Sequence, residues 1–302
     1  MSLTIVPGVP DRLPDMARLL SSALQREIPL RRLRRKYLSD GDAGRGQAHL
    51  LIDGGRAVGV AGYTLCRYVL PDGAVVTAAQ YGDFALLPEY RGTGVFGDLC
   101  QNIHQTICER GAAFSFALTS EGSRAVMTRA LNHQPMQDLH CFDIPLTSRS
   151  HLPVRVLDRA RRSFGWRGAA VERAPSAFRT ADSGHAERGD RFVSARRVAG
   201  IRFLEIEGHD VMIRPGSVSN VALPGDIDPA AVPGVLDALG RRARRAGTRV
   251  LRLMLTNDEP AFAHVDRIAG PAPGQLTYCA RDISTGLDMA RLRFGFADYE
   301  NF

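Results

Sequence analysis

The sequence predicts an α/β fold with mixed (α+β) sheets, built as two similar halves. Its 302 residues give room for about two domains of average size. Stretches with strand-like and helix-like hydrophobic spacing alternate along most of the chain. The segment from Gly111 to Ile144 resembles a later segment from Gly247 to Ile283, and the matching residues Thr119 and Thr256 lie 137 positions apart. This domain-sized period indicates a tandem duplication of one strand–helix unit rather than a solenoid.

Two helices are predicted near the start of the chain. Leu13, Met16, Leu19 and Leu20 are spaced i, i+3, i+4, which is typical of one face of a helix over residues 11–25. A second helix is predicted over residues 30–38, before the turn-forming sequence DGDAGRGQ.

Short strands and amphipathic helices then complete the first half. The turns Asp-Gly-Gly and Pro-Asp-Gly separate strand-like runs, and Pro88 ends the fourth of them. Phe96, Leu99, Ile103 and Ile107 mark the buried face of a helix. The predicted strands are 49–52, 57–66, 75–80, 83–87, 114–118 and 137–144, and the predicted helices are 95–110 and 123–131.

Residues 147–190 differ in composition and separate the two halves. They are rich in Arg, Ser, Ala and Gly and include Trp166. We interpret them as a linker with one short helix near 154–163, giving a first domain at 1–148, a linker at 149–189 and a second domain at 190–302. In the second half, a helix over 230–246 corresponds in position to the helix at 95–110.

Composition and charge exclude several functional classes. The chain has 44% hydrophobic and 24% charged residues, no apolar run approaching the ~18 residues of a membrane span, and no signal-peptide pattern, so we expect a cytoplasmic protein without a membrane partner. The net charge is +7, and Lys36 is the only lysine. The arginine runs near residues 31–36 and 241–245 fit solvated helix faces, and no nucleic-acid-binding motif is present.

Cysteine and histidine patterns give no reason to expect a metal. The five cysteines are odd in number and never spaced C-x-x-C, so reduced, buried thiols are expected. The histidines show no ligand spacing. We therefore predict no metal site.

The most informative motif is the loop Arg91-Gly92-Thr93-Gly94, which lies between a strand and a helix. Gly92 and Gly94 permit positive φ and close approach of a ligand to the backbone. Successive amides at the start of a helix beginning near Val95 provide an anion-binding concavity. The loop therefore predicts a diphosphate cradle, to which Arg91 adds charge-assisted hydrogen bonds.

With its flanking residues, LLPEYRGTGVF, this loop resembles the signature of the GCN5-related N-acetyltransferase (GNAT) superfamily, with Phe96 in place of the final small residue. The resemblance implies two such domains in tandem, the second degenerate because it lacks an equivalent loop. It also implies that acetyl-CoA or another acyl-CoA lies along the strand before the loop, with Thr119 or Ser123 contacting its pantetheine arm. The implied cofactor-binding residues are Ala85, Leu86, Leu87, Arg91, Gly92, Thr93, Gly94, Val95, Phe96, Gly97, Thr119 and Ser123.

The resemblance also suggests how acyl transfer is assisted. A free backbone N–H near Leu86 or Leu87, at a strand bulge, would polarise the thioester carbonyl. Asp83 is the first candidate for the general base and Glu121 the second, each with a structural role as the alternative. The tyrosine that usually acts as general acid is replaced by Thr128. Tyr81 is a third possibility for the general base, with packing as the alternative. The C-terminal carboxylate of Phe302 is a further candidate base, since the tail is aromatic and acidic.

These observations together predict an acyl-CoA-dependent N-acyltransferase. The expected reaction moves an acetyl or other acyl group directly, in a ternary complex, to a primary amine of a small molecule of the amino-sugar or amino-acid type. A non-catalytic acyl-CoA-binding regulatory module is the alternative, motivated by the missing tyrosine. Nucleic acid is not an expected partner, and a homodimer is left open.

Overall fold

The computed structural model describes residues 3–295 apart from 9, 39, 42–43, 147–182, 189, 199, 270–273 and 285. The chain divides into two compact units, which we describe separately. Unit 1 comprises Met1–Met136 and Thr277–Ala290, and unit 2 comprises Gln137–Leu276 and Arg291–Phe302. Each unit therefore combines an earlier and a later segment of the chain.

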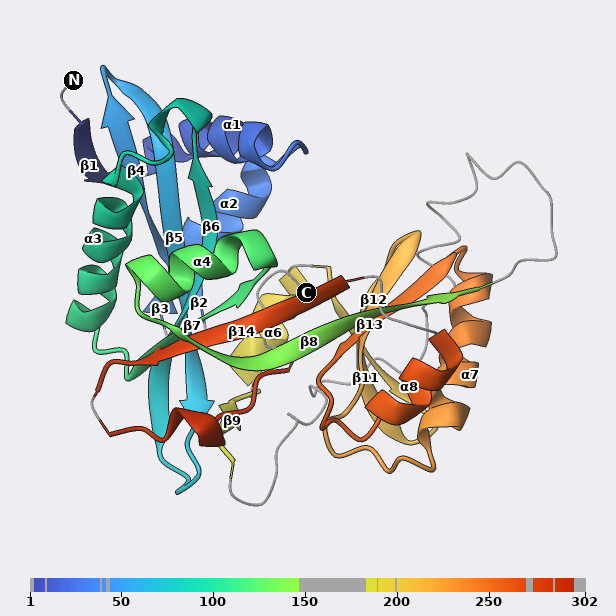
Figure 1. Ribbon diagram of the computed structural model, residues 1–302. Helices are drawn as coiled ribbons and strands as arrows, with labels where there is room; N and C mark the ends of the chain where they lie inside the picture. Colours follow the sequence, from blue (N-terminus) through green and yellow to red (C-terminus); the bar gives the residue numbers. More distant parts are fainter. Residues whose placement is uncertain are drawn as a thin grey trace. The chain divides into compact units, whose positions relative to one another are not determined.

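Unit 1 is built on one mixed sheet (Figure 1). Its strands lie in the order β1-β4-β5-β6-β7-β14, and β5 and β6 form the longest hairpin. The elements are β1 (Leu3–Pro7), η1 (Pro10–Arg12), α1 (Leu13–Ala23), α2 (Leu30–Leu38), β2 (Asp40–Gly41), β3 (Gly44–Arg45), β4 (Gln47–Asp53), β5 (Arg56–Val69), β6 (Val75–Leu86), η2 (Pro88–Tyr90), α3 (Val95–Glu109), β7 (Phe114–Thr119), α4 (Glu121–Ala130) and β14 (Gly274–Asp282).

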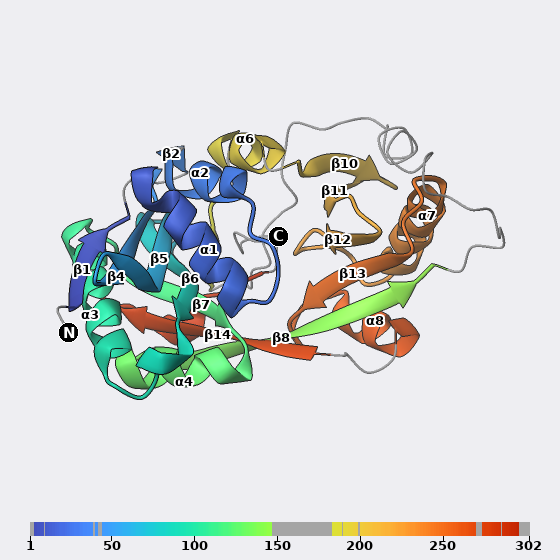
Figure 2. The ribbon, with the colours of Figure 1, turned by 90° about the horizontal axis from the view of Figure 1, so that it is seen from above.

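Helices cover both faces of this sheet. Figure 2 shows α1 and α2 on one face and α3 and α4 on the other. Helix α1 buries Leu13, Met16 and Leu20 against the sheet, and α3 buries Leu99 and Ile103. The i, i+3, i+4 spacing of these residues explains why the segments fold as helices, because it places every apolar side chain on the face that meets the sheet.

Unit 2 repeats this plan in reduced form. Its strands lie in the order β8-β13-β12-β11-β10, and α7 and α8 pack on the sheet through Val232, Val235, Leu239 and Val265. The elements are β8 (Gln134–Pro145), β9 (His185–Ala186), α6 (Asp190–Val198), β10 (Arg202–Ile206), β11 (His209–Arg214), β12 (Val218–Ala222), α7 (Val232–Arg245), β13 (Val250–Leu255), α8 (Phe262–Ala269) and η3 (Met289–Arg291), whose last residue alone belongs to this unit.

The compact units differ from the halves of the sequence by one exchanged strand each. Strand β14, near the end of the chain, pairs antiparallel with β7 of unit 1, from Thr277↔Thr119 to Asp282↔Phe114. Strand β8, from the first half, pairs antiparallel with β13 of unit 2. The division by sequence at 148 and 190 stays a prediction about the linear domains, and most of the linker, with its predicted helix at 154–163 and Trp166, lies outside the described residues.

The predicted elements of the first half are found with small shifts at their ends. The main difference is that the strands predicted at 75–80 and 83–87 form one strand, β6, interrupted by a bulge. Strand β1, which pairs with β4, was not predicted because its alternation spans only five residues. No helix among the described residues is long and apolar enough to cross a membrane.

Candidate active site in the first unit

Two neighbouring strands of unit 1 separate where the predicted cofactor strand begins. Strands β6 and β7 pair in parallel from Ala78↔Phe114 to Gln80↔Phe116. Beyond this point β6 continues to Leu86 and β7 to Thr119 without further pairing to each other. The backbone edge of β6 facing β7 is therefore left without ladder partners, and β7 is held by β14 on its other edge.

A β-bulge in β6 accompanies this separation. The register between β5 and β6 shifts between Val60 and Gly62, and Asp83 has a positive φ of 54°. Positive φ is uncommon for a residue other than glycine, and such strain persists only where surrounding contacts hold it. The bulge also increases local twist, which turns the end of β6 away from its neighbour.

Side chains from α2 hold the bulge in place. The carboxylate of Asp83 accepts a hydrogen bond from the Tyr37 hydroxyl at 2.8 Å and pairs with the Lys36 ammonium at 2.9 Å. A Cβ at Gly62 would overlap the Tyr37 hydroxyl, and one at Gly82 would lie 3.0 Å from the Lys36 nitrogen. The paired glycines Gly62 and Gly82 thus make room for the two α2 side chains to reach Asp83.

This environment fixes Asp83 in its charged form. The side chains of Asp83 and Lys36 are only 5% and 2% exposed. Burial acts to raise the pKa of Asp83, but the charges of Lys36 and Arg32 outweigh it and hold the pKa below its usual value. A buried carboxylate with a lowered pKa is a weak proton acceptor, so the geometry favours a structural role for Asp83 over that of general base.

The backbone N–H groups of Leu86 and Leu87 have different surroundings. The Leu87 N–H donates to the Val58 carbonyl at 2.9 Å, so it is engaged with β5. Leu86 pairs with Gly59, the next position along the antiparallel ladder. Because hydrogen-bonded and non-bonded pairs alternate in such a ladder, the Leu86 N–H points to the opposite edge, where β7 has separated. Of the two predicted amides, Leu86 is the one that can donate to a ligand.

The loop after β6 forms the predicted cradle. Gly92 and Gly94 have φ values of 77° and 86°, and Gly94 is the N-cap of α3. Within the described residues, the amides from Gly92 to Phe96 donate no hydrogen bond. Thr93 stabilises the loop by donating its hydroxyl to the Tyr90 carbonyl at 2.7 Å. Five successive free amides at the start of a fifteen-residue helix make an anion site.

Aromatic side chains connect the cradle with the separated strand. The rings of Phe84 and Phe96 pack edge to face at 5.8 Å, and Phe84 also contacts Tyr81. The turn before the cradle is tied to the β4–β5 hairpin, because the Tyr90 hydroxyl donates to Asp53 at 2.7 Å. The predicted residue Phe96 thus packs on β6 and fixes the orientation of α3.

The comparisons with known proteins agree with this geometry. Residues 7–125 match the acetyltransferase (GNAT) domain family, and the matched range includes β6, the cradle and α3. Unit 1 is a GNAT domain. The predicted family and the predicted class, acyl-CoA-dependent N-acyltransferases, are thereby confirmed.

Solved structures extend the likeness in fold to the whole chain. A tandem GNAT protein from the clavulanic acid biosynthesis pathway has a TM-score of 0.60 at 10% identity, covering 95% of this chain and 100% of that one. GCN5-related N-acetyltransferases from Sphaerobacter thermophilus (TM-score 0.57, 18% identity, 95% and 98% covered) and Kribbella flavida (0.60, 14%, 94% and 71%) are also similar. The tandem GNAT fold is therefore confirmed. No curated protein matches the sequence.

The other predicted residues of the GNAT domain lie at the end of β7 and in α4. Thr119 is buried and donates its hydroxyl to the Thr277 carbonyl at 2.8 Å, and Ser123 donates to the Ser120 carbonyl. Glu121 is exposed at the first position of α4 and has no partner among the described residues. Thr128, at the family's tyrosine position, donates to the Arg124 carbonyl of its own helix at 3.1 Å.

Buried polar contacts near the paired part of β6 and β7 were not predicted from the sequence. The Tyr81 hydroxyl lies 3.1 Å from Nδ1 of His104 on α3. His133 lies between the Leu131 carbonyl, which its Nδ1 contacts at 3.1 Å, and the Ser115 hydroxyl, 2.9 Å from Nε2. Burial lowers the pKa of His133 to about 3, so this ring is neutral and donates to the carbonyl through Nδ1.

The equivalent position of unit 2 has lost the features that bind phosphates. Helix α7 follows β12 as α3 follows β6, and β12 and β13 pair in parallel as β6 and β7 do. Its N-terminal turn contains Pro233, which lacks an amide hydrogen, and Asp228 accepts the Ala230 N–H at 2.9 Å. The carboxylate of Asp228 would repel a diphosphate, so the described residues before α7 do not form an equivalent cradle.

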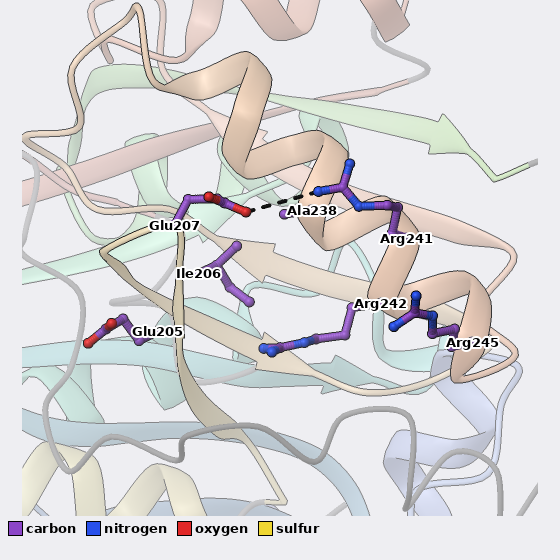
Figure 3. Close-up of a pocket in the computed structure, with 7 residues that line it drawn as sticks. All are labelled: Glu205, Ile206, Glu207, Ala238, Arg241, Arg242 and Arg245. Carbon is purple, nitrogen blue, oxygen red and sulfur yellow. Dashed lines mark ion pairs between the residues drawn. The ribbon is translucent and has the colours of Figure 1, made fainter.

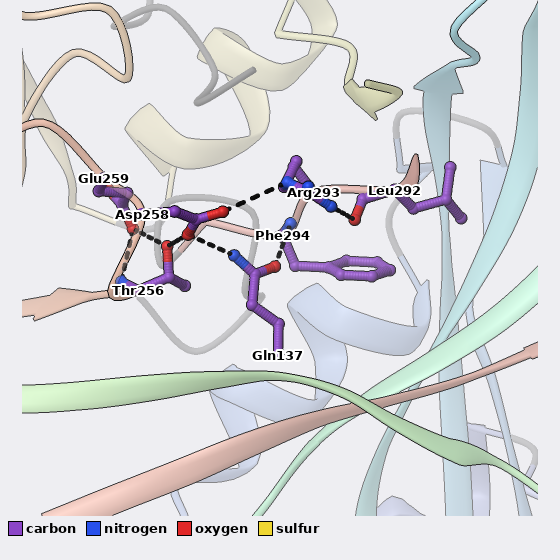
Figure 4. Close-up of polar contacts among 7 residues, drawn as sticks. All are labelled: Gln137, Thr256, Asp258, Glu259, Leu292, Arg293 and Phe294. Atoms are coloured by element: carbon purple, nitrogen blue, oxygen red, sulfur yellow. Dashed lines mark hydrogen bonds and ion pairs between the residues drawn. The ribbon is translucent and has the colours of Figure 1, made fainter. Parts of the chain in front are cut away.

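Phe302, whose carboxylate is a further predicted base, lies outside the described residues, but the segment before it is anchored in unit 2 (Figure 4). The Phe294 N–H donates to Oε1 of Gln137 at 3.1 Å, and Arg293 lies 3.4 Å from Asp258. Asp258 also accepts the Thr256 hydroxyl at 2.7 Å. These contacts fix the chain up to Phe294, whose ring is fully buried.

Glu259 in the same cluster has a strongly shifted pKa. Its Oε1 accepts the Thr256 N–H at 2.9 Å. Burial raises the pKa of Glu259 to about 7, although the hydrogen bonds from Thr256 oppose the rise. The sequence contains a related signal, since Asp258, the neighbour of Glu259, occupies the position of the second repeat that matches Glu121 of the first. Among the described residues, no group of His, Cys, Asp or Glu is placed to hold a metal ion.

Proposed function

We propose that this protein transfers an acetyl group from acetyl-CoA to a primary amine of a small molecule, directly and in a ternary complex. The observation that supports it best is that the unpartnered edge of β6 and the cradle of free amides follow each other directly in unit 1. The edge of β6 that has no partner leads into the cradle of free amides at the start of α3. A pantetheine arm hydrogen-bonds like an extended strand, so the first feature suits the arm and the second suits the diphosphate.

Acetyl-CoA would supply the acyl group as a thioester. Leu86 would donate its N–H to the carbonyl oxygen as negative charge develops there, which stabilises the tetrahedral intermediate. The amine nitrogen forms a bond to the carbonyl carbon, the carbon–sulfur bond breaks, and the thiolate leaves. We propose Glu121 as the group that takes up the amine proton, because it is exposed and unpaired whereas Asp83 is held by Lys36.

We infer that the acceptor is a small amine of the amino-sugar or amino-acid type carrying an anionic group. The chain has 39 Lys and Arg against 32 Asp and Glu. A positive field of this kind attracts anionic acceptors and disfavours polycations. The acyl group is proposed to be acetyl, as the name of the matching domain family suggests.

The proposal is tested by measuring thiol release from acetyl-CoA with a panel of amines. Gly94→Asp places a negative charge in the cradle and should lower acetyl-CoA affinity by about tenfold or more. Gly111→Asp is the matched control, since Gly111 also has positive φ and open space, at the other end of α3. Both variants carry similar backbone strain, so equal losses of affinity would contradict a diphosphate at the cradle.

A second candidate function is a non-catalytic acyl-CoA-binding module. It is favoured by Thr128, whose hydroxyl is bonded to its own helix and cannot protonate a leaving thiolate. Thiol release decides between the two. Binding of acetyl-CoA without amine-dependent release, in both the wild type and Glu121→Gln, would establish the module. A loss of release in Glu121→Gln with unchanged affinity would establish the transferase.

A further inference from the structure

A cavity in unit 2, far in sequence from the GNAT site, carries an excess of positive charge. Its volume is about 200 Å³, and it lies between the C-terminal half of α7 and the β10–β11 hairpin (Figure 3). Three arginines and two glutamates are among the residues that line it: Glu205, Ile206, Glu207, Ala238, Arg241, Arg242 and Arg245.

The three arginines differ in their partners. Arg241 is neutralised, because it pairs with Asp237 one turn earlier and lies 4.0 Å from Glu207. Arg242 and Arg245 have no hydrogen bond or ion pair among the described residues. In Figure 3 the Arg242 guanidinium extends from α7 toward the hairpin, and the carboxylate of Glu205 points away from it.

Arg242 is the lining residue whose unpaired donor indicates a ligand. Its Nη1 atom is shielded from solvent and has no hydrogen-bond partner. Leaving a cationic donor buried and unpaired is costly, and native structures nearly always pair such groups. Arginines in the last turn of a helix often complement its dipole, but Nη1 of Arg242 makes no bond to the terminal carbonyls.

We propose that this cavity binds a small phosphate monoester through Arg242 and Arg245. Two unpaired guanidinium groups match the charge and the fork geometry of a dianionic phosphate, which they can hold by several parallel N–H···O bonds. The volume suits a phosphoryl group with a small substituent. This site is separate from the cradle. Its lining residues all belong to unit 2 and include the C-terminal half of α7, whereas the cradle lies at the N-terminus of α3 in unit 1.

The test is calorimetric titration of the full chain with inorganic phosphate at constant ionic strength, with acetate as the comparison anion. Saturating CoA is present in a parallel titration, because the cradle of unit 1 also attracts phosphate. Arg242→Met should lower phosphate affinity by about tenfold or more, whereas the neighbouring exposed Arg244→Gln, outside the cavity, should change it less than about twofold. Because Arg242→Met leaves the cradle intact, this comparison holds whether or not CoA binds.

Thermal unfolding without phosphate supplies an independent readout. Arg242→Met removes a partly buried guanidinium whose Nη1 has no partner and keeps the apolar stem, so it should raise the Tm in phosphate-free buffer and abolish the rise that phosphate gives the wild type. A lower Tm for Arg242→Met in phosphate-free buffer, an unchanged phosphate response in that variant, or equal binding of acetate and phosphate would each overturn the proposal.

Discussion

At the scale of single residues, Asp83 is predicted as a general base, and its contacts support the structural alternative. Its sequence position, on the strand before the cradle, is the same for a base and for a residue that fixes the bulge. Only the structure shows Lys36 at 2.9 Å and Tyr37 at 2.8 Å. The sequence did contain one relevant signal, since Lys36 is the only lysine of an arginine-rich chain, and its slender ammonium fits against Gly82.

Asp83→Asn should therefore destabilise the fold. It leaves the Lys36 ammonium buried without its partner, at a cost on the order of 3 kcal/mol. Because the pKa of Asp83 is lowered in the folded state, its stabilisation is present above the ordinary value of 3.8 and is lost as the pH falls through the lowered pKa. The difference in unfolding free energy between wild type and variant, measured in urea at neutral pH and again at low pH, should shrink toward acid.

A matched control is the ion pair of Arg252 on β13 with Asp143 on β8, which joins two neighbouring strands instead of a helix and a strand. Its side chains are 36% and 32% exposed. Asp143→Asn should cost less, about 1 kcal/mol, because water screens a pair whose side chains are about one-third exposed. Equal losses in the two variants would contradict the structural role assigned to the buried pair.

Glu259 gives a second prediction at this scale, with the opposite sign of pH dependence. Its pKa is about 7 in the folded state against an ordinary value of 4.5, so the folded protein binds the extra proton between these values. Stability should fall as the pH rises from about 4.5 to 7, and Glu259→Gln should remove this slope. Above pH 7 we expect the free energy of unfolding of the Glu259→Gln variant to exceed that of the wild type by on the order of 1–3 kcal/mol. Wild-type and variant stability curves that run parallel across this range would show that the carboxyl is ionised throughout.

At the scale of elements, local patterns predicted much of unit 1. Apolar spacing located α1, α2 and α3 because each has one strongly buried face, and Pro88 and Gly94 marked the end of β6 and the start of α3. The bulge was expected from the family resemblance, but its position at Asp83 could not be read from the sequence. It depends on packing between Tyr37, Gly62 and Gly82, which are brought together only by the fold.

The packing at the bulge predicts that Gly62→Ala is harmful. The added methyl group would overlap the Tyr37 hydroxyl, so either the ring or the strand must shift, at a cost of about 2 kcal/mol. Gly234→Ala in α7 is the control, because its Cβ would meet nothing within 4 Å and alanine favours the helix by roughly 0.5–1 kcal/mol. Chemical denaturation of both variants measures the difference. If Gly62→Ala were as stable as the wild type, the Tyr37 hydroxyl would not lie against Gly62.

At the scale of the whole molecule, the duplication was visible in the sequence and the strand exchange was not. Each repeat ends in a strand, and a strand carries no local mark of which sheet it joins. Strand β14 contributes Tyr278, Cys279 and Ala280 to unit 1, all at most 1% exposed, although they follow unit 2 in the chain. Pairing of this kind is set by long-range contacts, for which periodicity gives no information.

The exchange predicts how fragments behave. Residues 1–148, the first domain as divided by sequence, lack β14, so β7 would have an unpaired edge and Phe116 would lose its contact with Tyr278, 6.4 Å between ring centres. An exposed hydrophobic edge strand favours aggregation. We expect this fragment to aggregate or to unfold without a cooperative transition. Residues 1–136 joined through a long Gly-Ser linker to 274–290 restore the unit and should unfold cooperatively in circular dichroism. If residues 1–148 alone unfold in a sharp transition and the fusion is no more stable, β14 is dispensable and the exchanged strand does not complete the unit.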